Sequence, residues 1–375
     1  MNQNNAGQTN NDENNDNSKH ERDALEVNEL GGGVYGEVFS DSGHGINQEK
    51  LKEALSVKLG AKIIRADCQT FQLHGGTLGD VRLVKGTAET VNGDKLQYSL
   101  VLKKQKKWER YGDPGSWRRE YDLYASDFDK LFTGSLRWPE CYLAEINGDE
   151  WQIWMEYVDG VSGLDLSCDM YVQAAEELGR FQGKLYAEQP KVLKNLTNLS
   201  GADAMKNFYL HYRSWRTVYD YIRSDDCEIP KHLCEMIAGV DNQADEIWRN
   251  IEQLPVVFCH RDFWVTNIFH IDSKIILIDW DTSGWGHLGE DIVSLIADEA
   301  DVDNMAEYYE KCVPAYCKGF SEFTDISQIT NIYIRERIIL HFGYRLVEWF
   351  LNAKSPDERD MQINTLQKIY EMGSV

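Results

Sequence analysis

The distribution of apolar residues changes character near residue 159. Over residues 61–158, short apolar runs alternate with polar positions and are separated by Gly, Asn and Asp, which is typical of strands and hairpins. Over residues 159–375, apolar residues recur at three- and four-residue spacing in long stretches, which is typical of amphipathic helices. The pattern predicts an α+β chain with a small antiparallel β-sheet followed by a larger, mainly helical part. The stretches with helical spacing after the middle of the chain are residues 170–187, 203–224, 229–254, 302–320, 325–353 and 356–373.

The first 60 residues differ from this pattern. Residues 1–20 are rich in Asn and nearly free of apolar residues, so they bury too little surface to offset their chain entropy, and we expect a disordered tail. We interpret residues 21–60 as an N-terminal extension with one helix. Leu51 and Leu55 are four residues apart within that helix, and Gly60 is its expected end.

Residues 256–281 contain the densest group of candidate chemical residues. A short apolar run leads into the triplet HRD, which ends at Asp262. Asn267 follows five residues later, and Asp279 closes a second apolar run. The pattern predicts strand, loop, strand, tight turn and strand, which brings these three polar side chains close together. Phosphoryl transfer to an alcohol requires such parts: a carboxylate to orient the hydroxyl, and oxygen ligands for Mg²⁺ on the triphosphate.

The order His-x-Asp-x-x-x-x-Asn followed by Ile-Asp-Trp resembles the catalytic and metal loops of the aminoglycoside phosphotransferase and choline kinase family. The resemblance implies a bilobal, protein-kinase-like fold in which Asp262 is the catalytic base and His260 supports its loop. It implies that Asn267 and Asp279 bind Mg²⁺. It also implies that Asp291 hydrogen-bonds beneath the catalytic loop. Each residue alone would fit a hairpin with solvated polar side chains, and it is their order that indicates a kinase.

Two glycine-rich segments are candidates for the phosphate-binding turn. The segment GGGVYGEV, residues 31–38, matches the G-x-G-x-x-G-x-V pattern of protein kinases, but the next plausible lysine strand ends 67 residues after its last glycine. We therefore assign it to the extension. The segment HGGTLGD offers Gly75, Gly76 and Gly79 between strand-like runs. Backbone N–H groups in such a turn can approach phosphate oxygens, because no Cβ intervenes.

The strand that follows ends in two lysines, Lys103 and Lys104, which should face opposite ways because side chains alternate along a strand. The family pattern Val-x-Lys favours Lys103, on the face of Val101, as the residue that binds the α- and β-phosphates. Lys104 is the alternative. Glu120, in the predicted helix RREYDLY, resembles the helix glutamate that holds this lysine by an ion pair.

Residues 141–158 predict a hairpin that turns at Asn147 and Gly148. Its second strand ends in MEYV, which resembles the hinge between the two lobes in this family. Backbone groups from Glu156 to Val158 would pair with the adenine edge there. The resemblance therefore implies ATP as the phosphoryl donor, and GTP is not excluded.

Composition and charge narrow the choice of partners. The chain has 375 residues, of which 42% are hydrophobic, and no apolar run approaches the ~20 residues that span a membrane. Its start lacks the basic-then-apolar design of a signal peptide, so we expect a cytoplasmic protein with no membrane partner. The net charge of −23 disfavours nucleic acid and permits a cationic acceptor. The eight cysteines show no C-x-x-C spacing, and we expect reduced thiols.

The sequence thus predicts transfer of the γ-phosphoryl group of ATP, with Mg²⁺, to a hydroxyl of a small acceptor. The expected acceptor is amine-bearing, aminoglycoside-like or choline-like. The alternatives are a nucleotide-binding module with little activity and a protein kinase. The complete set of candidate residues speaks against the first, and the absence of a long activation segment speaks against the second. The oligomeric state is not predicted.

Overall fold

The computed structural model describes residues 45–372 except residues 74–78, 111, 215 and 299–301. Several expectations fall outside the described residues. These are the disordered tail over residues 1–20, the GGGVYGEV segment of the extension, and Gly75 and Gly76.

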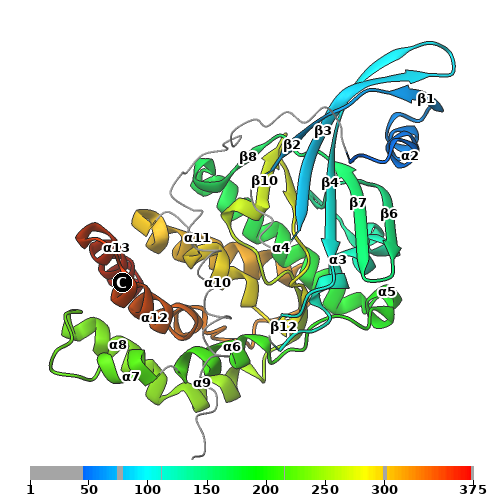
Figure 1. Ribbon diagram of the computed structural model, residues 1–375. Helices are drawn as coiled ribbons and strands as arrows, with labels where there is room; N and C mark the ends of the chain where they lie inside the picture. The colour runs from blue at the N-terminus through cyan, green and yellow to red at the C-terminus, as the bar shows by residue number, and fades with distance from the viewer. Residues whose placement is uncertain (1–44, 74–78, 111, 215, 299–301, 373–375) are drawn as a thin grey trace, which may run out of the picture.

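An antiparallel six-stranded sheet forms the smaller of two lobes (Figure 1). The strand order is β1-β3-β4-β7-β6, and β2 pairs with β3. The elements of this lobe are α2 (Gln48–Leu59), β1 (Ile63–Ala66), β2 (Gln69–Gln72), β3 (Asp80–Thr90), β4 (Lys95–Lys106), α3 (Ser116–Tyr124), β6 (Cys141–Asn147) and β7 (Glu150–Glu156).

Side chains alternate along β4, so its two faces pack against two different hydrophobic cores. Leu100 and Leu102 point to one face and pack in a cluster with Leu51 and Leu55 of α2. Val101 lies between them and points to the opposite face, where it packs on the core that includes α3 and the larger lobe. The side chains of β4 that follow Val101 on this face therefore point toward α3 and the larger lobe.

Helix α2 has clear start and stop signals in its sequence. The side chain of Asn47 accepts hydrogen bonds from the backbone N–H groups of Glu49 and Lys50, and Gly60 ends the helix with a left-handed φ of 61°. The helix packs on β1 and β6. In packing terms it is part of the small lobe, although the sequence-based division placed it in an extension that ends at residue 60.

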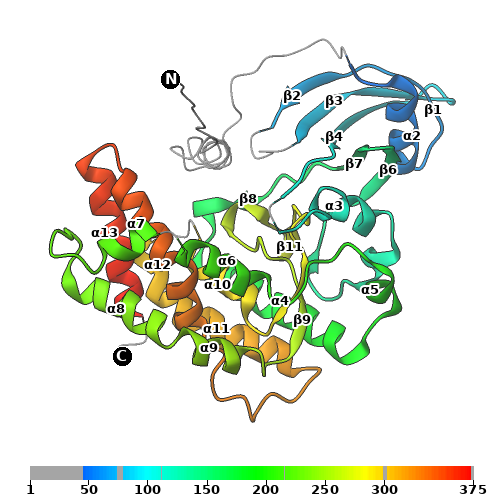
Figure 2. The same ribbon diagram turned by 60° about the horizontal axis from the view of Figure 1, so that its bottom comes forward.

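The larger lobe is mainly helical and also contains two small sheets, of which strands β8 and β11 lie on the side that faces the small lobe (Figure 2). One sheet has the order β5-β11-β10-β8, and the other pairs β12 with β9. The strands are β5 (Leu136–Arg137), β8 (Val161–Ser162), β9 (Val256–Cys259), β10 (Ile268–Ile271), β11 (Lys274–Leu277) and β12 (Gly284–His287). The α-helices are α4 (Cys168–Glu188), α5 (Lys191–Asn195), α6 (Ala204–Arg213), α7 (Arg216–Tyr221), α8 (Lys231–Asn242), α9 (Ala244–Ile251), α10 (Glu290–Ala297), α11 (Met305–Ser321), α12 (Ile334–Asn352) and α13 (Pro356–Glu371). Short 3₁₀ turns are η1 (Asp127–Leu131), η2 (Gly163–Asp165), η3 (Val265–Asn267) and η4 (Val302–Asn304).

Helices α4 and α11 pack against each other at the centre of this lobe with their backbones in close approach. A Cβ atom on Gly179 would lie 2.1 Å from the carbonyl oxygen of Tyr316, and one on Gly319 would lie 2.0 Å from that of Glu176. Only glycine fits at both positions, so the sequence of these helices sets how closely they pack.

Some helix boundaries differ from those expected. Residues 203–224 and 229–254 each form two helices rather than one continuous stretch. The helix expected from residue 325 begins only at Ile334, because Tyr333 before it has a left-handed φ of 58° that does not continue a helix. The apolar spacing runs through these breaks, and for this reason the pattern alone did not predict them.

None of the helices within the described ranges combines the length and apolar character of a membrane span. All eight cysteines are free thiols in the structure, although Cys227 and Cys234 approach each other with their Sγ atoms 3.5 Å apart.

The contact between α4 and α11 can be tested with one added methyl group. We expect Gly179→Ala to lower the free energy of unfolding by about 1–3 kcal/mol, because the new Cβ meets a backbone atom that cannot move aside alone. Gly239→Ala in α8 is the matched control, since a Cβ there has nothing within 4 Å. It should raise stability by up to about 1 kcal/mol through helix propensity. Urea unfolding of both variants measures the difference, and equal behaviour would contradict the close approach.

Candidate active site

Lys103 lies near the end of β4, where its amine meets carboxylates from both lobes. Its Nζ is 2.6 Å from Oε2 of Glu120 on α3 and 2.8 Å from Oδ1 of Asp279, which follows β11 in the larger lobe. The exposed fraction of the Glu120 side chain is 2% and that of Lys103 is 14%. Lys104, the alternative considered from the sequence, lies on the opposite face of the strand. The structure thus brings together three of the residues singled out from the sequence.

The charges of this cluster influence one another strongly. Burial lowers the pKa of Lys103, but the carboxylates of Asp279 and Glu120 outweigh burial, so the pKa lies above its ordinary value. Burial raises the pKa of Asp279, and the adjacent charge of Lys103 outweighs that effect and lowers it. Burial and then the charge of Asp279 raise the pKa of Asp281 to about 6. The site carries more carboxylates than the one lysine balances, and an excess of negative charge of this kind favours a bound cation.

Asp262 and Asn267 lie together on the loop between β9 and β10. The Asn267 amide nitrogen donates to Oδ2 of Asp262 at 2.7 Å and to its carbonyl oxygen at 3.0 Å. This orientation leaves the amide oxygen of Asn267 without a hydrogen bond to any described residue. Burial, followed by the charge of Asp279, raises the pKa of Asp262 well above its ordinary value.

His260 connects the loop of Asp262 to the segment of Asp279. Its Nε2 is 3.0 Å from the carbonyl oxygen of Ile278, and its Nδ1 accepts a hydrogen bond from the backbone N–H of Asp262 at 3.2 Å. The ring packs edge-on against Trp280 at a centroid distance of 4.5 Å. Burial lowers the pKa of His260 to about 4, so the imidazole is neutral and its Nδ1 can act as an acceptor.

Asp291, on α10, holds the same loop from below. Its two carboxylate oxygens accept hydrogen bonds from the backbone N–H groups of His260 (2.9 Å) and Arg261 (2.7 Å). Gln182 of α4 donates to it at 2.8 Å. Burial raises the pKa of Asp291 to about 7, while the two backbone donors act in the opposite direction.

Two residues that flank this site have left-handed backbone conformations. Arg261 has a φ of 70° and Asp279 has a φ of 63°. Such conformations cost energy for residues other than glycine and persist where surrounding contacts hold them. The Arg261 side chain is held by an ion pair with Glu290 at 2.9 Å and by a hydrogen bond to the Ser200 hydroxyl at 2.5 Å. Arg261 thus forms a salt bridge within the larger lobe.

The remaining predicted residues lie at the edges of this site. Gly79 precedes β3, where a Cβ would lie 2.9 Å from the carbonyl oxygen of Lys104. The carboxylate of Glu156 forms a two-pronged ion pair with Arg137 of β5 at 2.6 and 2.9 Å. The backbone N–H of Glu156 donates to the carbonyl of Glu140 at 2.9 Å. Val158, just after β7, is buried and makes no backbone N–H donation within the described residues.

Sequence reasoning missed two arginines of this region. Arg110 pairs with Asp281 at 3.3 Å, and the side chain of Arg119, with 1% exposed, bonds to Asp113 and to the Asp281 carbonyl. The one sequence signal for Arg119 was its position next to Glu120 on a short predicted helix. The residues that bind Arg119 come from distant segments, so this signal did not reveal its role.

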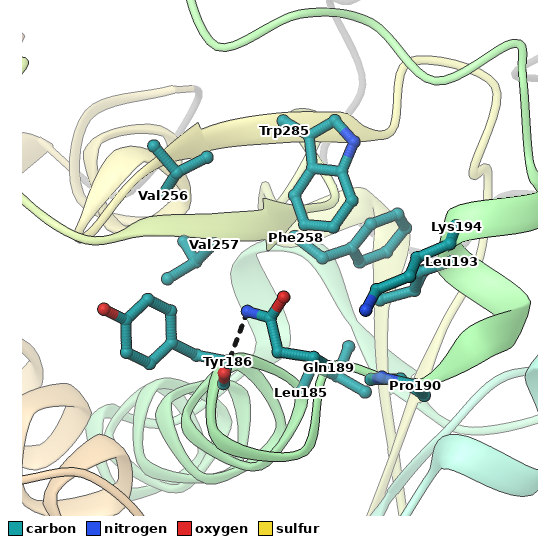
Figure 3. A pocket seen from close by; sticks show the side chains of 10 residues that line it. All are labelled: Leu185, Tyr186, Gln189, Pro190, Leu193, Lys194, Val256, Val257, Phe258 and Trp285. Carbon is teal, nitrogen blue, oxygen red and sulfur yellow. Dashed lines mark hydrogen bonds between the residues drawn. The ribbon is translucent and has the colours of Figure 1, made fainter.

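An apolar hollow elsewhere in the larger lobe is separate from this cluster. It lies between the end of α4, α5, β9 and β12, and its volume is about 20 Å³, which is room for roughly one water molecule (Figure 3). The amide of Gln189 at its wall donates to the carbonyl of Tyr186 at 3.1 Å. It borders the beginning of β9 rather than the loop after it, and we interpret it as a packing gap.

Solved structures of similar fold are small-molecule kinases. The amicoumacin kinase hAmiN, in complex with AMP-PNP, Ca²⁺ and Ami, is 17% identical, with 86% of this chain and 95% of that chain covered and a TM-score of 0.50. The spectinomycin phosphotransferase APH(9)-Ia, in complex with ADP and spectinomycin, is 14% identical, with coverage of 88% and 96% and a TM-score of 0.46. A choline kinase from Cryptosporidium parvum Iowa II is 14% identical, with coverage of 81% and 89% and a TM-score of 0.48. At this identity the likeness to hAmiN concerns the fold, and it confirms the expected two-lobed, protein-kinase-like α+β class.

No curated protein sequence matches the chain. The sequence profile of the phosphotransferase enzyme family (APH) matches residues 133–323, just over half of the chain. This range contains the loop of Asp262 and Asn267, the segment of Asp279 and the support from Asp291. The family expected from the sequence is thereby confirmed, and the chain belongs to the phosphotransferase enzyme family.

Proposed function

We propose that this protein transfers the γ-phosphoryl group of ATP to a hydroxyl group of a small-molecule acceptor. The observation that carries the proposal is the convergence of Lys103 and Glu120 from the small lobe with Asp279 from the large lobe, at 2.6 and 2.8 Å. A lysine held between two carboxylates is fixed in position and can bind the α- and β-phosphates. Asp262 and Asn267, on the neighbouring loop, supply the remaining groups.

The residues present fit a magnesium ion. Asp279 uses one carboxylate oxygen for Lys103, which leaves the other as a ligand, and the orientation of Asn267 leaves its amide oxygen available. Mg²⁺ prefers oxygen ligands and commonly takes only one or two from the protein, with the rest from phosphates and water. Within the described residues no group of three or more His, Cys, Asp or Glu side chains could hold a metal, which fits a site that relies on the nucleotide. The bound ion would neutralise charge on the departing phosphoryl group.

Asp262 is the residue we assign as the base. Its carboxylate is oriented by the amide of Asn267 and would accept the proton of the acceptor hydroxyl. Burial and the charge of Asp279 raise its pKa, so this carboxylate holds a proton more strongly than an exposed aspartate does. The supports from His260 and Asp291 would keep this group within hydrogen-bonding reach of the acceptor, because positioning dominates phosphoryl transfer.

The adenine is assigned to the hinge after β7. The N–H and the carboxylate of Glu156 are engaged by Glu140 and Arg137, so we place the adenine edge at the backbone of Val158. Gly79, just before β3, would cover the phosphates. Backbone recognition alone does not distinguish ATP from GTP, and either nucleotide satisfies this arrangement.

The acceptor we propose is small and amine-bearing. The net charge of −23 attracts cations, and two solved structures of similar fold are named for spectinomycin and choline. A protein substrate is disfavoured, because only six residues separate Asp279 from Gly286 and leave no long activation segment. A nucleotide-binding module without turnover would not require Asp262.

The test of this function is a coupled assay of Mg·ATP consumption by the full-length chain. Aminoglycosides, amino alcohols and a generic protein substrate are the acceptors. We expect acceptor-dependent turnover with a small amine-bearing alcohol. Turnover only with the protein substrate would indicate a protein kinase, and nucleotide binding without any turnover would indicate the module.

The role of Asp262 can be tested by removing its charge. We expect Asp262→Asn to lower kcat by about 10²–10⁴-fold, because the acceptor proton loses its base, while the Kd for Mg·ATP changes little. Asp149→Asn, in the exposed turn between β6 and β7, is the control for the same chemical change. Turnover numbers and calorimetric Kd values check both variants. An Asp262→Asn protein with wild-type kcat would remove the assigned role.

The role of Asp279 predicts a different defect. Asn tolerates the left-handed backbone, so Asp279→Asn removes charge without new strain. We expect the affinity for Mg·ATP to fall by at least about tenfold, since a metal ligand is weakened. The control is Asp272→Asn, an exposed residue with a φ of 46°. Titration of Mg²⁺ at fixed ATP measures the effect, and an unchanged Mg²⁺ requirement would exclude Asp279 as a ligand.

A further inference from the structure

Helix α3 carries Glu120 but has few local signals that would hold it in place. It has only nine residues, Gly115 at its N-cap provides no side-chain hydrogen bond, and its first turn has no acidic residue and its last turn no basic one. Short helices without caps depend on tertiary contacts for their stability and position. The contacts that hold α3 therefore decide where the carboxylate of Glu120 lies.

Arg119 provides the most extensive of these contacts. Its guanidinium makes a two-pronged ion pair with Asp113 at 2.6 and 2.9 Å, in the segment that leads into α3. It also donates to the backbone carbonyls of Asn198 at 2.6 Å and of Asp281 at 2.5 Å, both in the larger lobe. With 1% of its side chain exposed, Arg119 is buried at the junction of the lobes. Figure 2 shows α3 between the sheet of the small lobe and the larger lobe.

These bonds connect the two partners of Lys103. Arg119 is adjacent to Glu120 on one helix, and the carbonyl that it binds at Asp281 lies two residues after Asp279. We infer that Arg119 is a positioning residue: it fixes α3 against the segment after Asp279, so that both carboxylates converge on Lys103. The phosphate-binding lysine is thus oriented through a buried arginine that does not itself reach the amine.

Lysine cannot replace this arginine. A planar guanidinium satisfies a carboxylate with two parallel bonds and still has donors for two carbonyls, whereas an ammonium is a single point charge. Arg119→Lys should keep the charge and release most of the contacts. A displacement of α3 by ~1 Å would break the 2.6 Å bond to Glu120 and leave Lys103 misplaced.

The inference rests on the proposed function, because it assigns Lys103 to the phosphates. The test compares the affinities of the full-length protein for Mg·ATP and for adenosine, which lacks phosphates. We expect Arg119→Lys to weaken Mg·ATP binding by about tenfold or more and to change adenosine binding by less than about twofold, because only the phosphate contact depends on Lys103. A role limited to holding the lobes together would weaken both ligands equally.

The neighbouring arginine is the matched control. Arg118 precedes Arg119 on α3, has 45% of its side chain exposed and contacts Asp122 and Tyr121 of the same helix. The Arg118→Lys protein should have the same affinities for Mg·ATP and for adenosine as the wild type. Asp113→Asn is the second variant, which weakens the ion pair of Arg119 without changing α3, and it should show the same selective loss in smaller degree.

The outcomes separate this inference from the proposed function. If the wild type does not bind Mg·ATP, the proposed function fails. If the wild type binds it and a folded Arg119→Lys, checked by thermal unfolding, retains the wild-type ratio of the two affinities, the positioning role is overturned. If Arg119→Lys does not fold, the ratio in Asp113→Asn decides by the same criterion.

Discussion

The amine of Lys103 joins the two lobes into one site, because it pairs with a carboxylate from each of them. It carries one positive charge between Glu120 of the small lobe and Asp279 of the large lobe, and its own lobe contributes only one of these carboxylates. Removing either lobe would leave a buried charge without its partner, which costs more than the pair contributes. The nearby carboxylates fit a function in which a cation enters together with a triphosphate and balances their negative charge.

Much of the site could be predicted from the sequence, because its residues lie on short segments that follow one another along the chain and pair as neighbouring strands. The loop of Asp262 and Asn267 and the segment of Asp279 are joined by the hairpin of β10 and β11, so their proximity was predictable from strand and turn signals. Alternation showed only that Lys103 and Lys104 face opposite ways, and it was the family pattern Val-x-Lys that favoured Lys103. Helix α2 was likewise evident from Asn47 and Gly60.

What the sequence did not reveal were contacts between distant segments. Arg119 binds Asn198 and Asp281, which lie 79 and 162 positions further along the chain. No local sequence pattern marks such partners. The break near residue 243 and the late start of α12 at Ile334 also escaped prediction, because the apolar spacing continues through both places. The side-chain role of Glu156 was missed for a related reason: its partner, Arg137, comes from another sheet.

The ion pair between Glu156 and Arg137 has a mechanical consequence when it is considered together with Arg119. Arg137 lies on β5, in the sheet of the larger lobe, so this pair fastens the small lobe at the hinge, while Arg119 fastens it a second time at α3. These contacts and the ion pair of Lys103 with Asp279 join the lobes at separate points, so any opening of the lobes would lengthen at least one of these charged bonds.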